Sequence, residues 1–307
     1  MAQIPSHVSA ASYPSPRAVI ALLKPITWFP PMWAFACGAV ATGAGVGERW
    51  LPVALGILLA GPLLCGTSQA VNDWFDRHVD AINEPDRVIP SGRMPGQWGL
   101  FVAIVMSVLS MAVASLLGSL VFIAALVGLA LAWAYSAPPF RFKQNGWIGN
   151  GVVGLSYETL PWITAAAATL GQTPSALTIM TALLYGLGAH GILTLNDFKS
   201  IKGDRQMGVD TLPVLHGARN AARIACLVMA TTQAGVILLL ALAGLATGAA
   251  LVGAVLALQM LCMIRFLRDP EGKAVWYSAV GVGLYVSGMM AAAVALGSLP
   301  LPSGTGV

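Results

Sequence analysis

Charged side chains are scarce in this chain of 307 residues. It has 16 lysines and arginines and 12 aspartates and glutamates, 9% of all residues, against about 25% in an ordinary soluble domain. Hydrophobic residues make up 57%. A soluble fold of this size needs more polar surface, and a disordered chain would be poor in apolar residues. The composition therefore excludes both classes and predicts an all-α polytopic membrane protein.

Cysteine is also scarce. The four cysteines are Cys37, Cys65, Cys226 and Cys262. All four lie inside apolar stretches and at no spacing typical of a metal site. They are interpreted as packing residues, which excludes a disulfide framework.

Long apolar stretches follow one another along the chain, and a membrane helix needs roughly 20 such residues. Glycine and proline separate the stretches. Strands of a membrane barrel would be alternating segments of about ten residues, half as long. We predict nine transmembrane helices, near residues 21–46, 52–72, 97–117, 119–137, 148–170, 174–196, 219–244, 246–267 and 274–297.

Lysine and arginine are distributed unevenly between the two sides of this arrangement. The N-terminal tail and the loops after the second, fourth, sixth and eighth helices hold 15 of the 16, and Arg49 alone lies on the other side. Positive charge accumulates on the cytoplasmic side. We therefore expect a cytoplasmic N-terminus and an external C-terminus.

Three regions are predicted along the chain. Residues 1–16 form a flexible tail, 17–300 the membrane domain, and 301–307 a short C-terminal tail. The first apolar stretch contains Pro25, Pro30 and Pro31, which suit a signal-peptide core poorly. It is expected to be retained as a membrane helix.

Acidic residues gather after the second apolar stretch, in the sequence NDWFDRHVD of residues 72–80. On a helix, offsets of three, four and seven residues place Asp73, Asp76 and Asp80 on one face. Three stacked carboxylates repel one another. We expect this helix end to need a cation at neutral pH.

A second acidic cluster follows 124 positions later. Asn196 and Asp197 match Asn72 and Asp73, and Asp204 lies seven residues beyond Asp197. Ser200 stands where the first cluster has an aspartate. The second and sixth helices are thus expected to end in matching acidic tips, as in an internally duplicated fold.

Carboxylates without histidine or cysteine favour an oxygen-preferring ion such as Mg²⁺, which commonly bridges carboxylates to substrate phosphates. Basic side chains nearby can neutralise the remaining phosphate charge. These bases are Arg77, Arg87, Arg93, Arg141, Lys143, Lys199, Lys202 and Arg205. We predict a diphosphate bound through metal at the membrane face, with a lipid tail between the helices.

The first cluster resembles the NDxxDxxxD motif of the UbiA family of intramembrane prenyltransferases. The resemblance continues through AINEPDRVIPSGR at residues 81–93 and YSAPPFRFK at 135–143. Residues 24–33 (KPITWFPPMW), 65–69 (CGTSQ) and 196–200 (NDFKS) resemble the chlorophyll synthase branch, and within it the bacteriochlorophyll synthases. Nearly the whole chain is covered.

The resemblance implies helices around a central cavity and two Mg²⁺ ions. Asp73, Asp76 and Asp80 would ligate one ion, and Asp197 and Asp204 the other. The diphosphate would be held by Asn72, Arg87, Arg93, Arg141, Lys143, Asn196, Lys199 and Lys202. Many members have a DxxxD pair in the second motif, which this chain lacks. The second metal is therefore expected to be held more loosely, or Lys202 to contact phosphate.

The resemblance also implies a reaction. A twenty-carbon prenyl group, geranylgeranyl or phytyl, would pass from its diphosphate to the propionate carboxylate of bacteriochlorophyllide. A carboxylate is ionised at neutral pH, so no strong general base is required. The setting would be a bacterial inner or intracytoplasmic membrane, with the site facing the cytoplasm. Other pigment-pathway membrane proteins are possible partners, and nucleic acid is not.

Two polar residues inside apolar stretches, Glu158 and His190, each have two possible roles. Glu158 either serves the site or makes a structural hydrogen bond, because ionisable groups within membranes are costly and commonly functional. His190 either ligates the magnesium of the macrocycle or makes a polar contact between helices.

Two alternative functions stay open. Another prenyltransferase of the same family, acting on a quinone precursor or haem, would share the diphosphate site. A cation-coupled transporter with two related halves would place its charges near the bilayer midplane. The acids of this chain gather at helix ends instead, which favours the enzyme.

Overall fold

Helices account for nearly all regular structure in this computed structural model, which describes residues 13–45 and 47–300. In chain order they are α1 (Pro16–Leu23), η1 (Pro25–Thr27), α2 (Phe29–Val40), α3 (Trp50–Leu58), η2 (Leu59–Cys65), α4 (Gly66–Asn83), α5 (Trp98–Leu116), α6 (Ser119–Ser136), η3 (Phe142–Gln144), α7 (Gly146–Gly154), η4 (Leu155–Thr159), α8 (Leu160–Leu170), α9 (Ala176–Asp197), α10 (Ile201–Met207), α11 (Leu212–Leu242), α12 (Ala246–Arg268) and α13 (Pro270–Gly297). The tail predicted at 301–307, and residues 1–12 of the tail predicted at 1–16, lie outside the described residues.

Helices long and apolar enough to cross a membrane coincide with most of the predicted stretches. Seven pass this test by length and composition, and α1–η1 with α2 would add an eighth as one bent span. The stretch predicted at 148–170 is also helical, as α7, η4 and α8. Asn150 and Glu158 lower its hydropathy, and it is not among the candidate spans of the described chain. The chain is thus an all-α polytopic membrane protein, and nine crossings stay a prediction.

The first predicted helix is not continuous. α1 ends at Leu23, and the direction of the chain changes by 57° before α2. Lys24 has φ 46° and ψ 70°, a left-handed conformation that ends a helix. Pro25 follows and disfavours the helical region for the residue before it. The single helix predicted over 21–46 was therefore wrong in this respect.

Two helices contain a π-helical turn beside a proline. In the helix from Trp50 to Asn83, η2 contains Pro62. In the fifth stretch, η4 directly precedes α8, whose second residue is Pro161. Proline has no N–H to donate and its ring crowds the preceding turn, so the wider turn relieves the clash. Such turns are frequent at functional sites.

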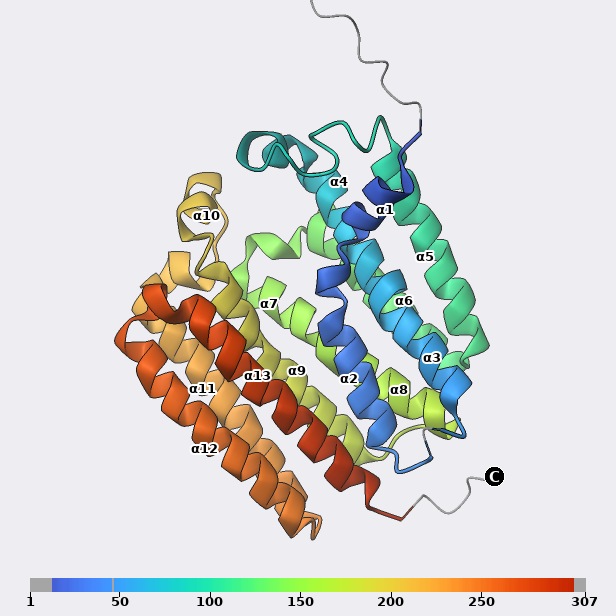
Figure 1. The fold of residues 1–307 in the computed structure, drawn as a ribbon, viewed down its shortest axis with the longest axis vertical. Coiled ribbons are helices and arrows are strands. Elements are labelled where there is room, and N and C mark those ends of the chain that lie inside the picture. Colours follow the sequence, from blue (N-terminus) through green and yellow to red (C-terminus); the bar gives the residue numbers. More distant parts are fainter. Residues whose placement is uncertain (1–12, 46, 301–307) are drawn as a thin grey trace, which may run out of the picture.

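Figure 1 shows α2 between two groups of helices. One contains α3 to α6 and α8, and the other α9 and α11 to α13. Small residues allow close packing: a Cβ on Gly38 of α2 would lie 2.2 Å from the carbonyl oxygen of Trp162. Trp162 in turn stacks on Tyr185 of α9 at 5.7 Å. Helices in membranes associate through such close van der Waals contact.

Candidate active site

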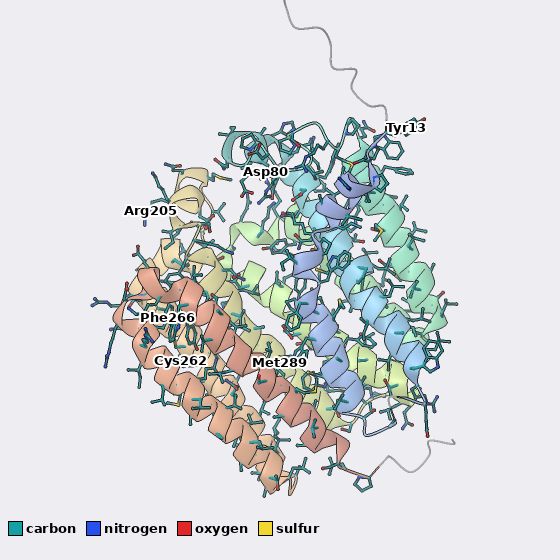
Figure 2. All side chains as sticks on the ribbon, viewed as in Figure 1. Tyr13, Asp80, Arg205, Cys262, Phe266 and Met289 are labelled. Atoms are coloured by element: carbon teal, nitrogen blue, oxygen red, sulfur yellow. The ribbon has the colours of Figure 1, made fainter. Side chains whose placement is uncertain are left out.

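The first acidic motif lies on the last turns of α4, as its spacing predicts. Asp73 and Asp80 are buried, with 2% and 6% of their surface exposed, and Asp76 is partly exposed. Figure 2 shows Asp80 at the same end of the molecule as Arg205, which lies on α10. Both acidic motifs are thus brought to one end of the helix bundle.

Each acid of the first motif is paired with a different base. Lys24 Nζ lies 2.6 Å from Asp73 Oδ1, and Arg87 Nη1 lies 3.0 Å from Asp80 Oδ2. Lys143 forms the third ion pair, with Asp76. Three carboxylates stacked on one helix face need a compensating positive charge. In the fold, three basic side chains supply that charge, Lys24 and Lys143 from distant parts of the chain and Arg87 from the loop that follows α4.

The loop after α4 carries two of the predicted phosphate-binding residues. Arg87 donates two hydrogen bonds to Glu84, at 2.6 and 2.9 Å, and these bonds lower the pKa of Glu84. Arg93 is exposed and bonds within its own loop, to the carbonyl oxygen of Asp86 at 2.6 Å and to Ser91 Oγ at 3.0 Å. Arg87 therefore reaches the acids of α4, and Arg93 does not.

Arg141 and Lys143 lie in the loop after α6. Burial lowers the pKa of Lys143, although the carboxylate beside it opposes the change. Arg141 has φ 43°, and its Nε is buried without a hydrogen-bond partner among the described residues. An unpaired buried donor is costly unless a ligand or water satisfies it. This guanidinium is therefore suited to binding an anion.

The second acidic motif is built differently from the first. α9 ends at Asp197, and α10 begins only at Ile201. The seven-residue spacing therefore does not place Asp197 and Asp204 on one continuous helix face, and the expected repeat of the first motif was wrong on this point. Ser200 Oγ donates to Asp204 Oδ2 at 2.6 Å across the break.

Asp197 is partly buried and accepts a hydrogen bond from Asn150 Nδ2 of α7 at 3.3 Å. The other predicted residues of this motif, Asn196, Lys199 and Lys202, are exposed. Asn83 Nδ2 approaches Met207 Sδ to 2.9 Å, which joins the ends of α4 and α10. The two motifs are thus linked at their tips.

Backbone hydrogen bonds join the loops of the two halves. Gly146 N donates to Asp210 O at 2.8 Å, and Asp210 N donates to Gln144 O at 3.0 Å. The loop that carries Arg141 and Lys143 is thereby fixed to the chain that follows α10. The backbone hydrogen bonds consequently fix the position of Arg141 and Lys143 relative to the second acidic motif.

A largely apolar pocket lies beside the acids of α4. Its walls come from α2, α3, η2, α4, α6, α7, η4 and α8. Ser68, one turn before Asn72, is part of its wall, and so is Tyr157 of η4, hydrogen-bonded by Gln69 Nε2 at 3.1 Å. Gly128 and the alanines beside it on α6 keep one wall open. Both π-helical turns face this pocket.

Sequence reasoning missed two residues that hold the acids, Lys24 and Asn150. Lys24 stands in a stretch noted only for its resemblance, and Asn150 is a single amide in an apolar stretch. Glu158 lies inside the protein, 5% exposed, with Oε2 unpartnered among the described residues. His190 Nε2 lies 3.3 Å from the carbonyl oxygen of Trp147, a polar contact between helices, which was one of the two alternatives for this residue.

Three histidine, cysteine, aspartate or glutamate side chains are nowhere gathered closely enough to hold a metal within residues 13–45 and 47–300. The bases hold the acids of α4 instead. The donor set nevertheless fits Mg²⁺, because it consists of carboxylate oxygens with amide groups nearby, and Mg²⁺ needs only one or two protein carboxylates when it also binds phosphate.

Curated relatives resemble the chain over almost its whole length. The bacteriochlorophyll synthase 33 kDa chain of Rhodobacter capsulatus is 55% identical over 94% of this chain and 96% of its own. The corresponding protein of Cereibacter sphaeroides is 54% identical over 94% of this chain and 95% of its own. Both matches therefore cover almost the whole of this chain and of the relative.

Among solved structures, a UbiA homolog from Archaeoglobus fulgidus bound to DMAPP and Mg²⁺ has the same fold. The TM-score is 0.68 at 17% identity, over 92% of this chain and all of the other. The sequence model of the UbiA prenyltransferase family matches residues 27–286. The two acidic motifs, their basic partners and the pocket all lie in this range apart from Lys24, and the chain belongs to the UbiA prenyltransferase family.

Proposed function

We propose that the chain esterifies bacteriochlorophyllide in bacteriochlorophyll biosynthesis. A twenty-carbon prenyl group, geranylgeranyl or phytyl, passes from its diphosphate to the propionate carboxylate of the pigment, and diphosphate is released. The observation that carries this proposal is the identity of 54–55% over nearly the full length to bacteriochlorophyll synthases. The acids and bases at one end of the bundle, beside an apolar pocket, support it.

Asp73, Asp76 and Asp80 would hold one Mg²⁺, and Asp197 and Asp204 a second. Asn72 supports this assignment because its Nδ2 donates to Asp76 Oδ2 at 3.0 Å and keeps that carboxylate oriented. Asn150 does the same for Asp197. Bound Mg²⁺ would neutralise the charge that develops on the departing diphosphate.

Arg87, Arg141 and Lys143 bind the diphosphate oxygens. Arg141 has an unsatisfied donor, and a guanidinium donates two parallel hydrogen bonds to phosphate. Lys143 already lies against Asp76, so a short movement of its side chain brings it to an anion at the same acid. Arg93, Lys199 and Lys202 are exposed at the rim of the site. There they attract the negatively charged prenyl diphosphate before it binds.

The apolar pocket receives the prenyl chain next to the breaking bond. Departure of diphosphate leaves an allylic cation, which must be kept from water. The rings of Tyr135 and Tyr157 line the pocket, and aromatic faces attract cations. The propionate carboxylate then attacks the allylic carbon and forms the ester. Because the carboxylate is ionised at neutral pH, this step takes no proton from the protein.

The site faces the cytoplasm in a bacterial inner or intracytoplasmic membrane. With nine crossings, 15 of the 16 lysines and arginines lie on the side of the acids, which supports a cytoplasmic site under the positive-inside rule. Tyr13 and the end of α13 lie at opposite ends of the bundle (Figures 1 and 2), as an odd number of crossings requires. The N-terminus is therefore cytoplasmic.

The test uses the purified protein in detergent with Mg²⁺, geranylgeranyl diphosphate and bacteriochlorophyllide. Esterified pigment is followed by its later elution on reversed-phase chromatography, with EDTA as the control. We expect ester that disappears with EDTA. Ester from a quinone precursor but not from the pigment would reassign the acceptor, and no product from a folded sample with any acceptor would refute prenyl transfer.

A further inference from the structure

Left-handed backbone conformations single out two basic residues. Among the described residues that are not glycine, only Lys24 and Arg141 have positive φ, 46° and 43°. A side chain makes this conformation unfavourable, and it persists where the surrounding structure enforces it, commonly at functional sites. Arg141 already has a role in the proposed function. Lys24 does not.

Hydrogen bonds hold the turn around Lys24. Thr27 donates twice to the carbonyl oxygen of Lys24, from N at 2.9 Å and from Oγ1 at 2.8 Å. Trp28 Nε1 donates to the carbonyl oxygen of Leu23 at 2.8 Å. The turn thereby lies against α4, with Lys24 Nζ 2.6 Å from Asp73 Oδ1. The strained backbone places an ammonium group on the first acid of the motif.

Burial differs across this ion pair. The side chain of Asp73 is 3% exposed, whereas that of Lys24 is 25% exposed. A carboxylate buried to this extent needs a positive partner at all times. The partly exposed side chain of Lys24 has room to turn away toward water. Arg87 Nη1, at 3.5 Å, remains near Asp73 when it does.

We infer that Lys24 is an exchangeable counter-ion, an inference that rests on the proposed function. It holds Asp73 while no divalent cation is bound, and it contacts the diphosphate of the donor once a cation has taken the carboxylate. A metal ion about 2.1 Å from the carboxylate oxygen would be pushed away by an ammonium group on the same oxygen. Lysine and metal therefore compete, whereas lysine and diphosphate attract one another.

Lys24→Met separates these two roles, because it should strengthen the binding of a metal ion and weaken the binding of the diphosphate. Mn²⁺ serves as the probe, and the loss of the free-ion signal in electron paramagnetic resonance reports binding without any pigment. We expect Lys24→Met to bind Mn²⁺ about tenfold more tightly than wild type in the absence of diphosphate. The KM for geranylgeranyl diphosphate should rise about tenfold, as expected when one charge-assisted contact is lost.

Lys273→Met is the matched control, because Lys273 pairs with Asp269 at 3.1 Å away from the acidic motifs. Both quantities should stay within twofold of wild type. If Lys24→Met does not fold, Lys24→Gln replaces it, because its amide can still donate to Asp73 and support the fold. It lacks the positive charge that repels Mn²⁺, so the same two changes are expected. Mn²⁺ binding that is unchanged or weaker in a folded variant would overturn the inference.

The proposed function fails separately. Wild-type protein that binds no Mn²⁺ would refute the metal site, and with it the exchange at Asp73. Wild-type protein that binds Mn²⁺ and geranylgeranyl diphosphate but forms no pigment ester would refute only the acceptor, and the comparison of Lys24→Met with wild type would still decide the role of Lys24.

Discussion

Asp76 differs from the other acids of α4 in its surroundings. It accepts a hydrogen bond from Asn72 Nδ2, which also contacts Ser136 Oγ of α6 at 3.2 Å. Its side chain is 18% exposed, against 3% for Asp73 and 9% for Asp80. Its removal therefore opens no closed cavity, and the charge that it leaves unpaired, on Lys143, keeps 15% of its side chain exposed. Loss of function at this residue can be separated from loss of fold.

We expect Asp76→Ala to reduce turnover at least a hundredfold while the protein still inserts and folds, because the proposed metal site would lose a carboxylate whose charge counts most in the transition state. Initial rates of ester formation measure the effect, and thermal unfolding measures the fold. Asp269→Ala, at an exposed acid between α12 and α13, is the control. Activity of Asp76→Ala within twofold of wild type would remove the first motif from the mechanism.

Arg141→Ala should mainly raise the KM for the prenyl diphosphate, by about tenfold, which corresponds to the roughly 1.5 kcal/mol of a hydrogen bond to a charged group. The KM for the pigment should change little. Arg223→Ala serves for comparison, because its side chain is exposed on α11 and is hydrogen-bonded to Asn220. A raised KM for the pigment alone would assign the loop after α6 to the acceptor.

Helical periodicity was sufficient to predict the shared face of Asp73, Asp76 and Asp80, because one continuous helix carries all three. It could not predict Lys24 as a partner. That contact spans 49 residues and depends on a left-handed turn, which no local pattern in the sequence indicates. Asn150 was missed for the same reason, since its contact with Asp197 exists only once α7 packs on α9.

At the scale of the elements, the two π-helical turns shape the pocket. Leu59, Ala60 and Cys65 come from η2, and Ser156 and Tyr157 from η4. A π-helical turn holds one extra residue and shifts the register of the side chains that follow. The register shift in η2 occurs directly before α4, the helix that carries Asp73. The same turns therefore affect both the pocket and the orientation of the acids.

Gly128→Leu tests the pocket. A Cβ at Gly128 would lie 3.7 Å from Leu160 Cδ1, an ordinary contact, so the larger side chain extends into the pocket without displacing backbone. We expect the rate with a twenty-carbon donor to fall about tenfold or more and that with a ten-carbon donor to change less. Gly128→Ala is the control and should retain both. Equal losses for the two donors would place the prenyl chain elsewhere.

Hydropathy was sufficient to locate the helical stretches, because burial in lipid requires long apolar runs. It could not locate the bend at Lys24, the π-helical turns or the break between α9 and α10. These depend on backbone geometry rather than on apolar content. Hydropathy also fails to identify the segment formed by α7, η4 and α8 as a membrane span. This segment lines the pocket, and it is less apolar than the helices that face lipid.

At the scale of the whole molecule, the division into two groups of helices follows from the chain order. The first acidic motif belongs to the group with α3 to α6, and the second follows α9 of the other group (Figure 1). α2 lies between them and brings Lys24 with it. The site is therefore assembled from both groups, and its orientation depends on the number of crossings.

Membrane-impermeant maleimide tests that orientation. Gln206→Cys, next to Arg205 on α10, should react in inverted vesicles and not in spheroplasts, and Glu48→Cys, between α2 and α3, should show the reverse. Both positions are exposed. The unmodified protein is the control, because Cys37, Cys65 and Cys226 are buried and Cys262 is partly buried. Reaction of both variants from the same side would contradict nine crossings.

Neutralisation of the acids by Lys24, Lys143 and Arg87 has a consequence for biogenesis. A newly inserted chain carries its own counter-ions for the first motif, so the helices can assemble in the bilayer before any divalent cation arrives. Under the proposed function, metal would then be acquired by a finished protein, together with the prenyl diphosphate. We accordingly expect the amount of mature protein in the membrane to be independent of magnesium supply.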